Sequence, residues 1–380
     1  MIRKSTINLN YATTQKKLQL DLIFNEFKKI VNLYIENNWQ SEKLAKYISS
    51  KVDTWLSARM QQLAGKIAIQ IIKSVRKKDK NKRYKKYKRV YTYFKKQNRQ
   101  LNFLNLRFSE LNLNWKIKPI YKADIIELDE RFVNVQKGKN SFDLWVKFNS
   151  IGDRIKLMLP SKKHNHLLKF NDWNQKKSVR LRKNSRGYFC DLIFEKETPE
   201  IKEQGESLAI DVGINKLLAL SNNQFFGLEI KQLINKLHHR KQKSRNWFQT
   251  IQEIKNYIGE QCNKINFENI NLLVLENLTG LINKKNNRNN KTTRKLLGYW
   301  NRDLLKRKLK MLCEENRVYL HFVDPAYTSQ TCRSCGRISK RNRQGENFQC
   351  EKCGFTGDAD QLASLNILDR YRQQHIVACA

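Results

Sequence analysis

Acidic residues, proline and long apolar segments are all scarce in this sequence. Only 35 of its 380 residues are Asp or Glu, against 75 Lys and Arg, and the four prolines leave residues 1–117 without one. No apolar run is long enough for a transmembrane helix, and no secretory signal or isolated amphipathic anchor is evident. We therefore expect no membrane partner and a location in the reducing cytoplasm.

The shortage of acidic residues leaves a formal net charge of +40. Self-repulsion on this scale destabilises a compact state unless a polyanion neutralises it. The basic residues are spread over the whole length, which suits a long, highly charged partner, and nucleic acid is the first candidate. Hydrophobic residues make up 40% of the chain, so we expect a folded protein of two or three domains instead of a disordered basic tail.

Cysteine is the one residue type whose spacing points directly to a metal. Of the eight cysteines, four are scattered: Cys190, Cys262, Cys313 and Cys379. The others form two Cys-x-x-Cys pairs separated by fourteen residues: Cys332, Cys335, Cys350 and Cys353. Two such pairs in a reducing compartment predict a closed four-thiolate zinc site instead of disulfides. Nothing supplies an open coordination position, so we expect this zinc to be structural.

The first half of the chain shows two kinds of periodicity. Ile7, Leu9 and Tyr11 alternate as in a short strand, and spacings of three and four residues then predict two long helices packed together, around 20–34 and 56–71. From about residue 118 to 194 the period is again two, in several short segments. This pattern predicts a small antiparallel β-barrel. The N-terminal strand is expected to join it, with the helical block inserted between barrel strands.

Residues 76–96 combine positive charge with aromatic rings. Twelve of these twenty-one residues are basic and only Asp79 is acidic. A solvated helix face or a disordered loop explains the charge but not the aromatic rings, which can stack on bases or line a sugar–phosphate groove. We interpret this run as a nucleic-acid contact. Its candidate residues are Lys82, Arg83, Tyr84, Lys85, Lys86, Tyr87, Lys88 and Arg89.

From about residue 205 the pattern becomes that of an α/β domain. SLAIDVGINKLLALS reads as two strands around a glycine turn, and NQFFGLEI as a third strand. A charged helix or helical pair follows over 230–266. Residues 272–275 are four consecutive apolar residues, typical of a central strand covered on both faces. A helix over about 299–316 and the strand VYLHFVDP complete the pattern.

Three acids stand at the ends of these predicted elements. Asp211 and Glu276 each end an apolar strand, and Asp360 begins a helix. Taken singly, the strand-end acids could point to solvent, and Asp360 or Asp358 could simply cap the helix. Taken together, the three form a cluster that cannot stay ionised without cations. Two magnesium ions about 3.5–4 Å apart would suit a reaction at a phosphodiester.

Several motifs resemble one known family. AIDVGINK, LLVLENLTG, PAYTSQTCRSCG, FQCEKCGF and DADQLASLNIL, in this order, look like the C-terminal half of TnpB proteins, the transposon-encoded ancestors of type V CRISPR effectors. The resemblance covers residues 205–370, and over 1–200 it rests on the layout of strand, helical insertion and barrel. The sequence departs from the family at Leu362, where members carry Asn, and it lacks their opening Tyr-Pro-Thr element.

The resemblance implies a multidomain α+β protein with a RuvC-like nuclease of the RNase H fold. Its catalytic, magnesium-binding acids would be Asp211, Glu276 and Asp360, and its zinc ligands the four paired cysteines. The implied domains are a β-barrel (wedge) domain, a helical recognition domain, the nuclease domain and a zinc ribbon. In that order they would occupy 1–12 with 118–200, 13–117, 205–327 with 358–380, and 328–357.

The implied function is RNA-guided cleavage of DNA. A guide RNA and a target DNA would be the partners, zinc and magnesium the cofactors, and the prokaryotic nucleoid the place of action. A compact type V CRISPR effector with the same chemistry is the alternative within this class. A guide-directed repressor that does not cut would be expected to lack one or more acids, and all three are present. A plain zinc-ribbon binding protein would not account for the strands of Asp211 and Glu276.

Overall fold

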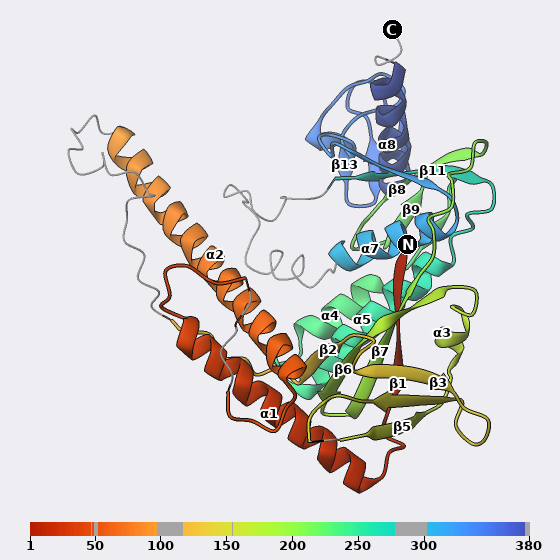
Figure 1. The fold of residues 1–380 in the computed structure, drawn as a ribbon. Helices are drawn as coiled ribbons and strands as arrows, with labels where there is room; N and C mark the ends of the chain where they lie inside the picture. Colours follow the sequence, from red (N-terminus) through yellow and green to blue (C-terminus); the bar gives the residue numbers. More distant parts are fainter. Residues whose placement is uncertain (47, 49–51, 97–116, 154, 278–301, 377–380) are drawn as a thin grey trace. The chain divides into compact units, whose positions relative to one another are not determined.

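A computed structural model describes the chain except for residues 47, 49–51, 97–116, 154, 278–301 and 377–380 (Figure 1). The chain divides into two compact units, residues 1–196 and 197–380. Both units mix helices with sheets. Within the described ranges, no helix combines the length and the apolar character that crossing a membrane requires.

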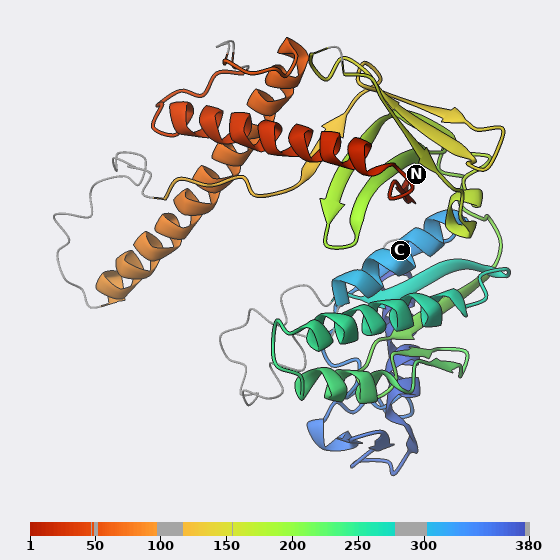
Figure 2. The same ribbon diagram turned by 90° about the horizontal axis from the view of Figure 1, so that it is seen from below.

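Two long helices of the first unit confirm the predicted helical block. Helix α1 (Thr14–Asn38) is capped by Thr13, whose side chain accepts a hydrogen bond from the Lys16 amide. Helix α2 (Ala58–Lys96) has 39 residues, about 58 Å at 1.5 Å per residue. The two helices pack against each other and cross, as Figure 2 shows. Apolar residues of α1 at three- and four-residue spacing are buried in this contact and in the adjoining core.

The strands of the first unit form two separate sheets. The four-stranded sheet has the order β1-β7-β6-β2, and all neighbours are antiparallel. Its strands are β1 (Ile2–Asn8), β2 (Ile125–Leu128), β6 (Asn174–Asn184) and β7 (Gly187–Glu195). The three-stranded sheet, β3-β4-β5, contains β3 (Val133–Lys137), β4 (Leu144–Phe148) and β5 (Leu157–Ser161), and the short helix α3 (Asn165–Leu168) follows it. The N-terminal strand pairs with β7, as expected.

The predicted closed barrel is wrong. No ladder of hydrogen bonds joins the two sheets in the described part of the unit. They instead contribute side chains to one common core, with Val146 and Leu159 from one sheet and Leu181 and Leu192 from the other. Alternating apolar residues predict which face of a strand is buried, and this is the same in a barrel and in two packed sheets. The pattern therefore cannot say which edges pair.

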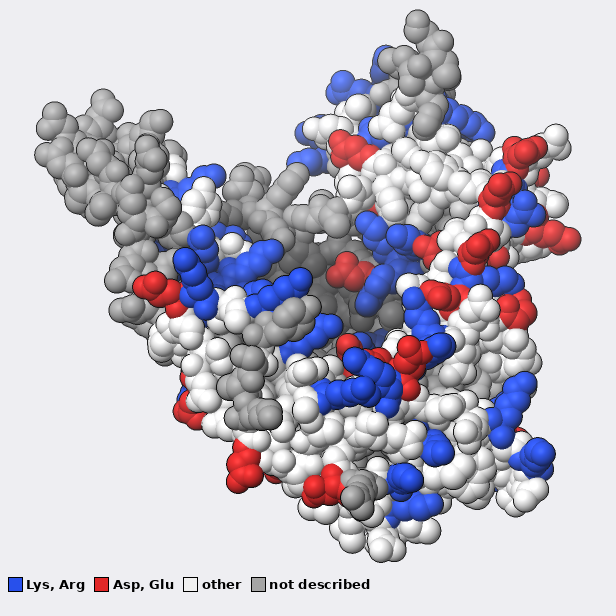
Figure 3. Space-filling model, viewed as in Figure 1, with Lys and Arg blue, Asp and Glu red and all other residues white. Residues whose placement is uncertain are grey.

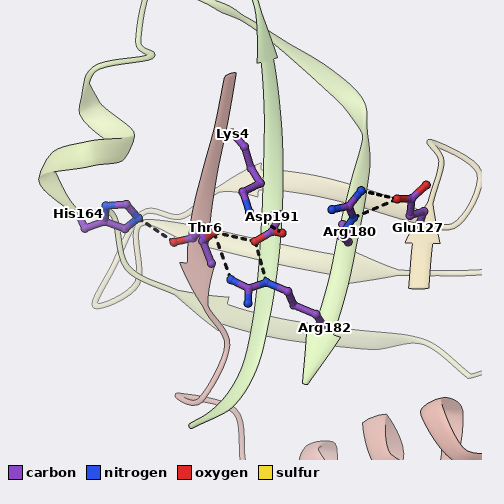
Figure 4. Close-up of polar contacts among 7 residues, drawn as sticks. All are labelled: Lys4, Thr6, Glu127, His164, Arg180, Arg182 and Asp191. Carbon is purple, nitrogen blue, oxygen red and sulfur yellow. Dashed lines mark hydrogen bonds and ion pairs between the residues drawn. The ribbon is translucent and has the colours of Figure 1, made fainter. Parts of the chain in front are cut away.

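A buried acid links three strands of the larger sheet. Asp191 on β7 is 1% exposed. It accepts hydrogen bonds from the Thr6 hydroxyl at 2.7 Å and from Arg182 Nε at 3.0 Å, and it pairs with Lys4 Nζ at 3.2 Å (Figure 4). Burial alone would raise the pKa of Asp191, but these hydrogen bonds and charges outweigh it and hold the pKa below its ordinary value. Strands β1, β7 and β6 are thus joined by charge as well as by their backbones.

We expect Asp191→Asn to destabilise this sheet at neutral pH. Removing one member of a buried charge cluster costs about 3 kcal/mol. Because the pKa of Asp191 is depressed on folding, its contribution is present above the unfolded value of about 3.9 and disappears as the pH falls through the folded value. The measurement is amide hydrogen exchange of β1 in the whole protein at pH 7. Glu127→Gln removes an exposed partner of Arg180 and serves as the control. Equal protection in both variants would contradict the prediction.

The second unit is a three-layer α/β structure. Its sheet has the order β10-β9-β8-β11-β12. Strand β9 is antiparallel to both of its neighbours, and β11 is parallel to β8 and β12. The strands are β8 (Glu206–Asp211), β9 (Leu218–Leu220), β10 (Phe225–Phe226), β11 (Ile270–Glu276) and β12 (Tyr319–Val323). The helices are α4 (Ile230–His238), α5 (Arg245–Asn263), α7 (Arg302–Glu315) and α8 (Ala359–Ile376).

Alternate residues of the central strands face different helices. Leu208 and Ile210 of β8 belong to the core that contains residues of α4, α5 and α7, and these helices lie together in Figure 2. Ala209 of β8 and Val274 of β11 belong to a second core with Ile367 of α8. Strand β11 is therefore covered on both faces, which confirms the prediction from its unbroken apolar run.

Candidate active site and metal centre

Two parallel strands bring the first two acids to the same edge of the sheet. The register pairs Ile210 of β8 with Leu275 of β11, so Asp211 and Glu276 follow at matching positions. Side chains alternate along a strand. Because the residues two positions earlier, Ala209 and Val274, pack toward α8, both acids are directed to the face that α8 covers. The sheet thus aims two carboxylates at one helix.

The third acid lies in the first turn of that helix, and its neighbour Asp358 performs the cap. Asp358 Oδ1 accepts hydrogen bonds from the amides of Asp360 at 3.0 Å and Gln361 at 2.9 Å. This is the contact by which a side chain satisfies the free amides at a helix start. Asp360 is 4% exposed. The sequence left open which aspartate caps the helix, and the structure assigns the cap to Asp358.

The charges of the other two acids act on Asp211. Burial, followed by the charges of Glu276 and Asp360, raises the pKa of Asp211 to about 7, although Arg343 opposes this. Burial also raises the pKa of Glu276, against a hydrogen bond donated by the Thr328 hydroxyl. A carboxyl group whose pKa is raised by its surroundings and by neighbouring like charges marks a candidate functional site. Hard divalent cations prefer carboxylate oxygens, so the chemistry of this donor set suits a divalent cation.

Two cations that the sequence did not single out contact the third acid. Arg343 Nη2 lies 2.6 Å from Asp360 Oδ1, and Lys216 Nζ lies 3.9 Å from Asp360 Oδ2. Lys216 belongs to the AIDVGINK motif and Arg343 to the basic loop between the cysteine pairs. The loop of Arg343 contains other Lys and Arg residues, and only tertiary contact shows which of them reaches the acids.

The four paired cysteines form a compact group of thiols. Their Sγ atoms all lie within 4.8 Å of one another. Cys332 Sγ is 3.7 Å from Cys353 Sγ, and Cys335 Sγ is 3.5 Å from Cys350 Sγ. A tetrahedron with zinc–sulfur bonds of 2.3 Å has sulfur atoms about 3.8 Å apart, so the arrangement fits zinc. Among the described residues, no other His, Cys, Asp or Glu set is gathered this closely, and the three acids do not converge to the same degree.

The two cysteine pairs are built on the same backbone pattern. In each, the glycine amide after the second cysteine donates to the carbonyl of the first, at 2.9 Å for Gly336 and 3.0 Å for Gly354. Both glycines have positive φ, 69° and 74°, which glycine adopts without a steric penalty. Asn342, fully buried, ties the pairs together because it donates to the Arg337 carbonyl and accepts from the Glu351 amide.

The cysteine group is packed directly against the start of α8. Between and after the cysteine pairs lie a short 3-10 helix (Lys340–Asn342) and the three-stranded sheet β13-β14-β15: β13 (Arg343–Gln344), β14 (Asn347–Gln349) and β15 (Thr356–Asp358). Leu362 of α8, with Phe348 and the cysteines, forms a small apolar core. Leucine at 362, where the related family carries Asn, therefore has a packing role here. Asp360 therefore lies within one helical turn of Ala359 and Leu362, which pack against the cysteine group.

The basic run lies on α2. Lys82, Tyr84, Lys85, Lys86, Lys88 and Arg89 are exposed, and Arg83 and Tyr87 are partly exposed. Lys and Arg side chains gather along this helix in Figure 3. Arg83 pairs with Asp79 at 2.8 Å. Of the other aromatic residues predicted to take part, Tyr93 is exposed, and the side chains of Tyr91 and Phe94 lie outside the described residues.

Parts of this sequence are similar to a known protein family and to individual proteins. A family model described as the Cas12f1-like TNB domain matches residues 303–367. A Cas12f1 CRISPR-associated endodeoxyribonuclease of Sulfoacidibacillus thermotolerans is 38% identical over 74 residues, which is 19% of this chain and 18% of that protein. A TnpB-like protein of Aquifex aeolicus is 37% identical over 98 residues, 25% of this chain and 31% of that protein. The chain thus matches less than a third of the length of either relative.

A solved structure shows the same overall fold. CasPhi-2 (Cas12j), bound to crRNA and phosphorothioate-DNA, aligns over 97% of this chain and 91% of its own, with a TM-score of 0.53 at 10% identity. At this identity the likeness concerns the fold alone. The sequence matches confirm the resemblance to the TnpB family over the part of the chain that they cover, where it is similar to TnpB-like and Cas12f1 proteins.

Proposed function

We propose that the protein is an RNA-guided DNA endonuclease of the TnpB type. The observation that carries this proposal is that Asp211 and Glu276 end neighbouring parallel strands at one edge of the second unit's sheet, where the charge of Asp360 acts on Asp211. The order of that sheet supports a RuvC-like RNase H fold: numbered along the chain it is 3-2-1-4-5, with the second strand antiparallel to its neighbours. The domain limits expected from the sequence, including a wedge at 1–12 and 118–200 and a ribbon at 328–357, are part of this proposal.

In the proposed reaction the three acids hold divalent ions, with magnesium as the expected metal. When bound, such ions supply Lewis-acid stabilisation of a phosphodiester and an activated water. The remaining residues prepare the carboxylates. The Thr328 hydroxyl donates a hydrogen bond to Glu276 and so orients its carboxylate. Arg343 holds Asp360 from the side of the cysteine group. Asp360 is buried, and Asp211 and Glu276 are half-buried, and limited contact with water strengthens the hold of carboxylates on a cation.

The other proposed parts supply binding and support. Zinc at the four cysteines would fix the segment that leads into Asp360. The basic run of α2 would follow the phosphates of a guide RNA or its duplex with DNA, since phosphate contacts position a nucleic acid without reading its sequence. The net charge of +40 supports a polyanionic partner and, with it, action at the prokaryotic nucleoid. Base pairing by the guide would then choose the target.

A compact type V CRISPR effector is the second candidate, because the Cas12f1-like TNB model and a Cas12f1 protein both match the chain. The two candidates share their chemistry and differ in the source of the guide.

The RNA bound to the purified protein tests both candidates. We expect RNA to copurify, and the complex to cut, with Mg²⁺ present, a DNA library whose target matches the end of that RNA. A transposon-end transcript would support a TnpB nuclease, and repeat-spacer RNA a CRISPR effector. Loss of cutting when Mg²⁺ is chelated is the matched control. Protein that binds RNA but leaves every matched DNA intact would contradict the nuclease proposal and favour a guide-directed repressor.

A further inference from the structure

Lys216 is a charged side chain that sequence reasoning gave no role, and its surroundings fix it closely. It follows Asp211 in the same motif, and its side chain is 13% exposed. Its Nζ forms an ion pair with Asp358 Oδ2 and lies 4.3 Å from the centre of the Phe225 ring on β10. A lysine held by a carboxylate and an aromatic face loses the freedom that a surface lysine keeps.

The turn before Lys216 is shaped to bring it back toward the acids. The Gly213 amide donates to the Leu217 carbonyl. A Cβ at Gly213 would lie 2.8 Å from the Lys216 carbonyl oxygen, so only glycine permits this close approach. The turn therefore places Lys216 beside the helix that carries the third acid.

Asp358 connects Lys216 to that helix. One of its oxygens, Oδ2, accepts from Lys216, and the other, Oδ1, accepts from the amides of Asp360 and Gln361. With both oxygens engaged, Asp358 is kept out of the acid cluster, and the first turn of α8 is fixed with Asp360 facing the sheet. Direct contact between Lys216 and Asp360 is looser, at 3.9 Å.

We propose that Lys216 is a positioning residue of the nuclease site, which acts through Asp358 to hold Asp360 where it can bind a divalent ion. This inference rests on the proposed function and adds a residue to it. The contacts of Lys216 thus connect the segment that carries Asp211 to the helix that carries Asp360.

The sign of one effect separates this role from simple charge compensation. A lysine that only balanced negative charge would compete with a metal ion, and its removal would tighten metal binding. A lysine that positions Asp360 does the opposite, and its removal weakens binding. Groups that orient metal ligands typically change metal affinity by about 10- to 100-fold when they are lost.

The test is Mn²⁺ binding to the full-length, RNA-free protein, followed by electron paramagnetic resonance. We expect Lys216→Met to weaken binding by about 10-fold, Lys216→Arg to restore most of it, and the exposed Lys255→Met to have no effect. Asp358→Asn keeps a capping side chain but loses the ion pair, and it should weaken binding as Lys216→Met does. Since both substitutions remove the same contact, the double variant should bind Mn²⁺ no more weakly than either single variant.

Two results would have different meanings. Equal or tighter Mn²⁺ binding by Lys216→Met, with wild-type protein binding normally, would overturn the positioning role and leave the proposed nuclease intact. Wild-type protein that binds no Mn²⁺ would overturn the proposed metal site, and the role of Lys216 with it. If Lys216→Met fails to fold, Asp358→Asn alone decides the question, because its helix cap is retained.

Discussion

Replacing Asp360 by alanine is expected to abolish DNA cutting while guide and target binding stay nearly intact. Asp360 is buried at the edge where Asp211 and Glu276 end their strands. Residues of a catalytic centre act as a unit, so loss of one should lower the cutting rate by at least about 1,000-fold. Asp211→Ala and Glu276→Ala should be equally severe. Cutting rate and target-DNA affinity, measured on the same RNA-bound preparation, check the prediction.

Asp358→Ala is the natural comparison, since it lies two residues away on the same segment. It removes a helix cap, which costs about 1 kcal/mol, and the ion pair with Lys216. Cutting should slow but remain measurable. If Asp360→Ala cuts normally and Asp358→Ala does not, the third acid has been assigned two residues too late. The hydrogen bonds from the Asp360 and Gln361 amides to Asp358 favour Asp358 as the cap and Asp360 as the third acid.

The positions of the three acids at the ends of their elements could be predicted from sequence, because each one ends or begins a strongly patterned element. Four apolar residues before Glu276 require a strand that is covered on both faces, and the structure places α7 and its neighbours on one side and α8 on the other. Parallel neighbours then end at the same edge. The paired cysteines were predictable for a similar reason, because metal ligands depend on local spacing.

The cations around the acids could not be predicted in this way. Arg343 reaches Asp360 over seventeen residues, and Lys216 reaches Asp358 over 142 residues. In a chain with 75 Lys and Arg, charge alone does not distinguish these two from the rest. The two sheets of the first unit were misread as a barrel for a related reason. Strand edges pair according to tertiary packing, while the alternation of apolar residues reports only on the buried face.

Cys350→Ser should reduce bound zinc from about one ion per chain to almost none, as four thiolates are required to close a structural site. Structural zinc is worth about 10–16 kcal/mol in small zinc-binding peptides, so its loss should loosen residues 328–357. Cys350 also belongs to the apolar core that includes Leu362. The disturbance should therefore reach the first turn of α8.

Cutting is expected to fall in Cys350→Ser for this structural reason, although the three acids are unchanged. Arg343 and Asp358, both held by the sheet β13-β14-β15, would no longer be fixed beside Asp360. Elemental analysis gives the zinc content, and hydrogen exchange of the segment 328–357 follows its order. Cys313→Ala, at a buried cysteine of α7, is the control and should keep its zinc. Wild-type protein that contains no zinc would contradict this account of the cysteine group. Asp360→Ala, by contrast, should lose cutting and keep its zinc.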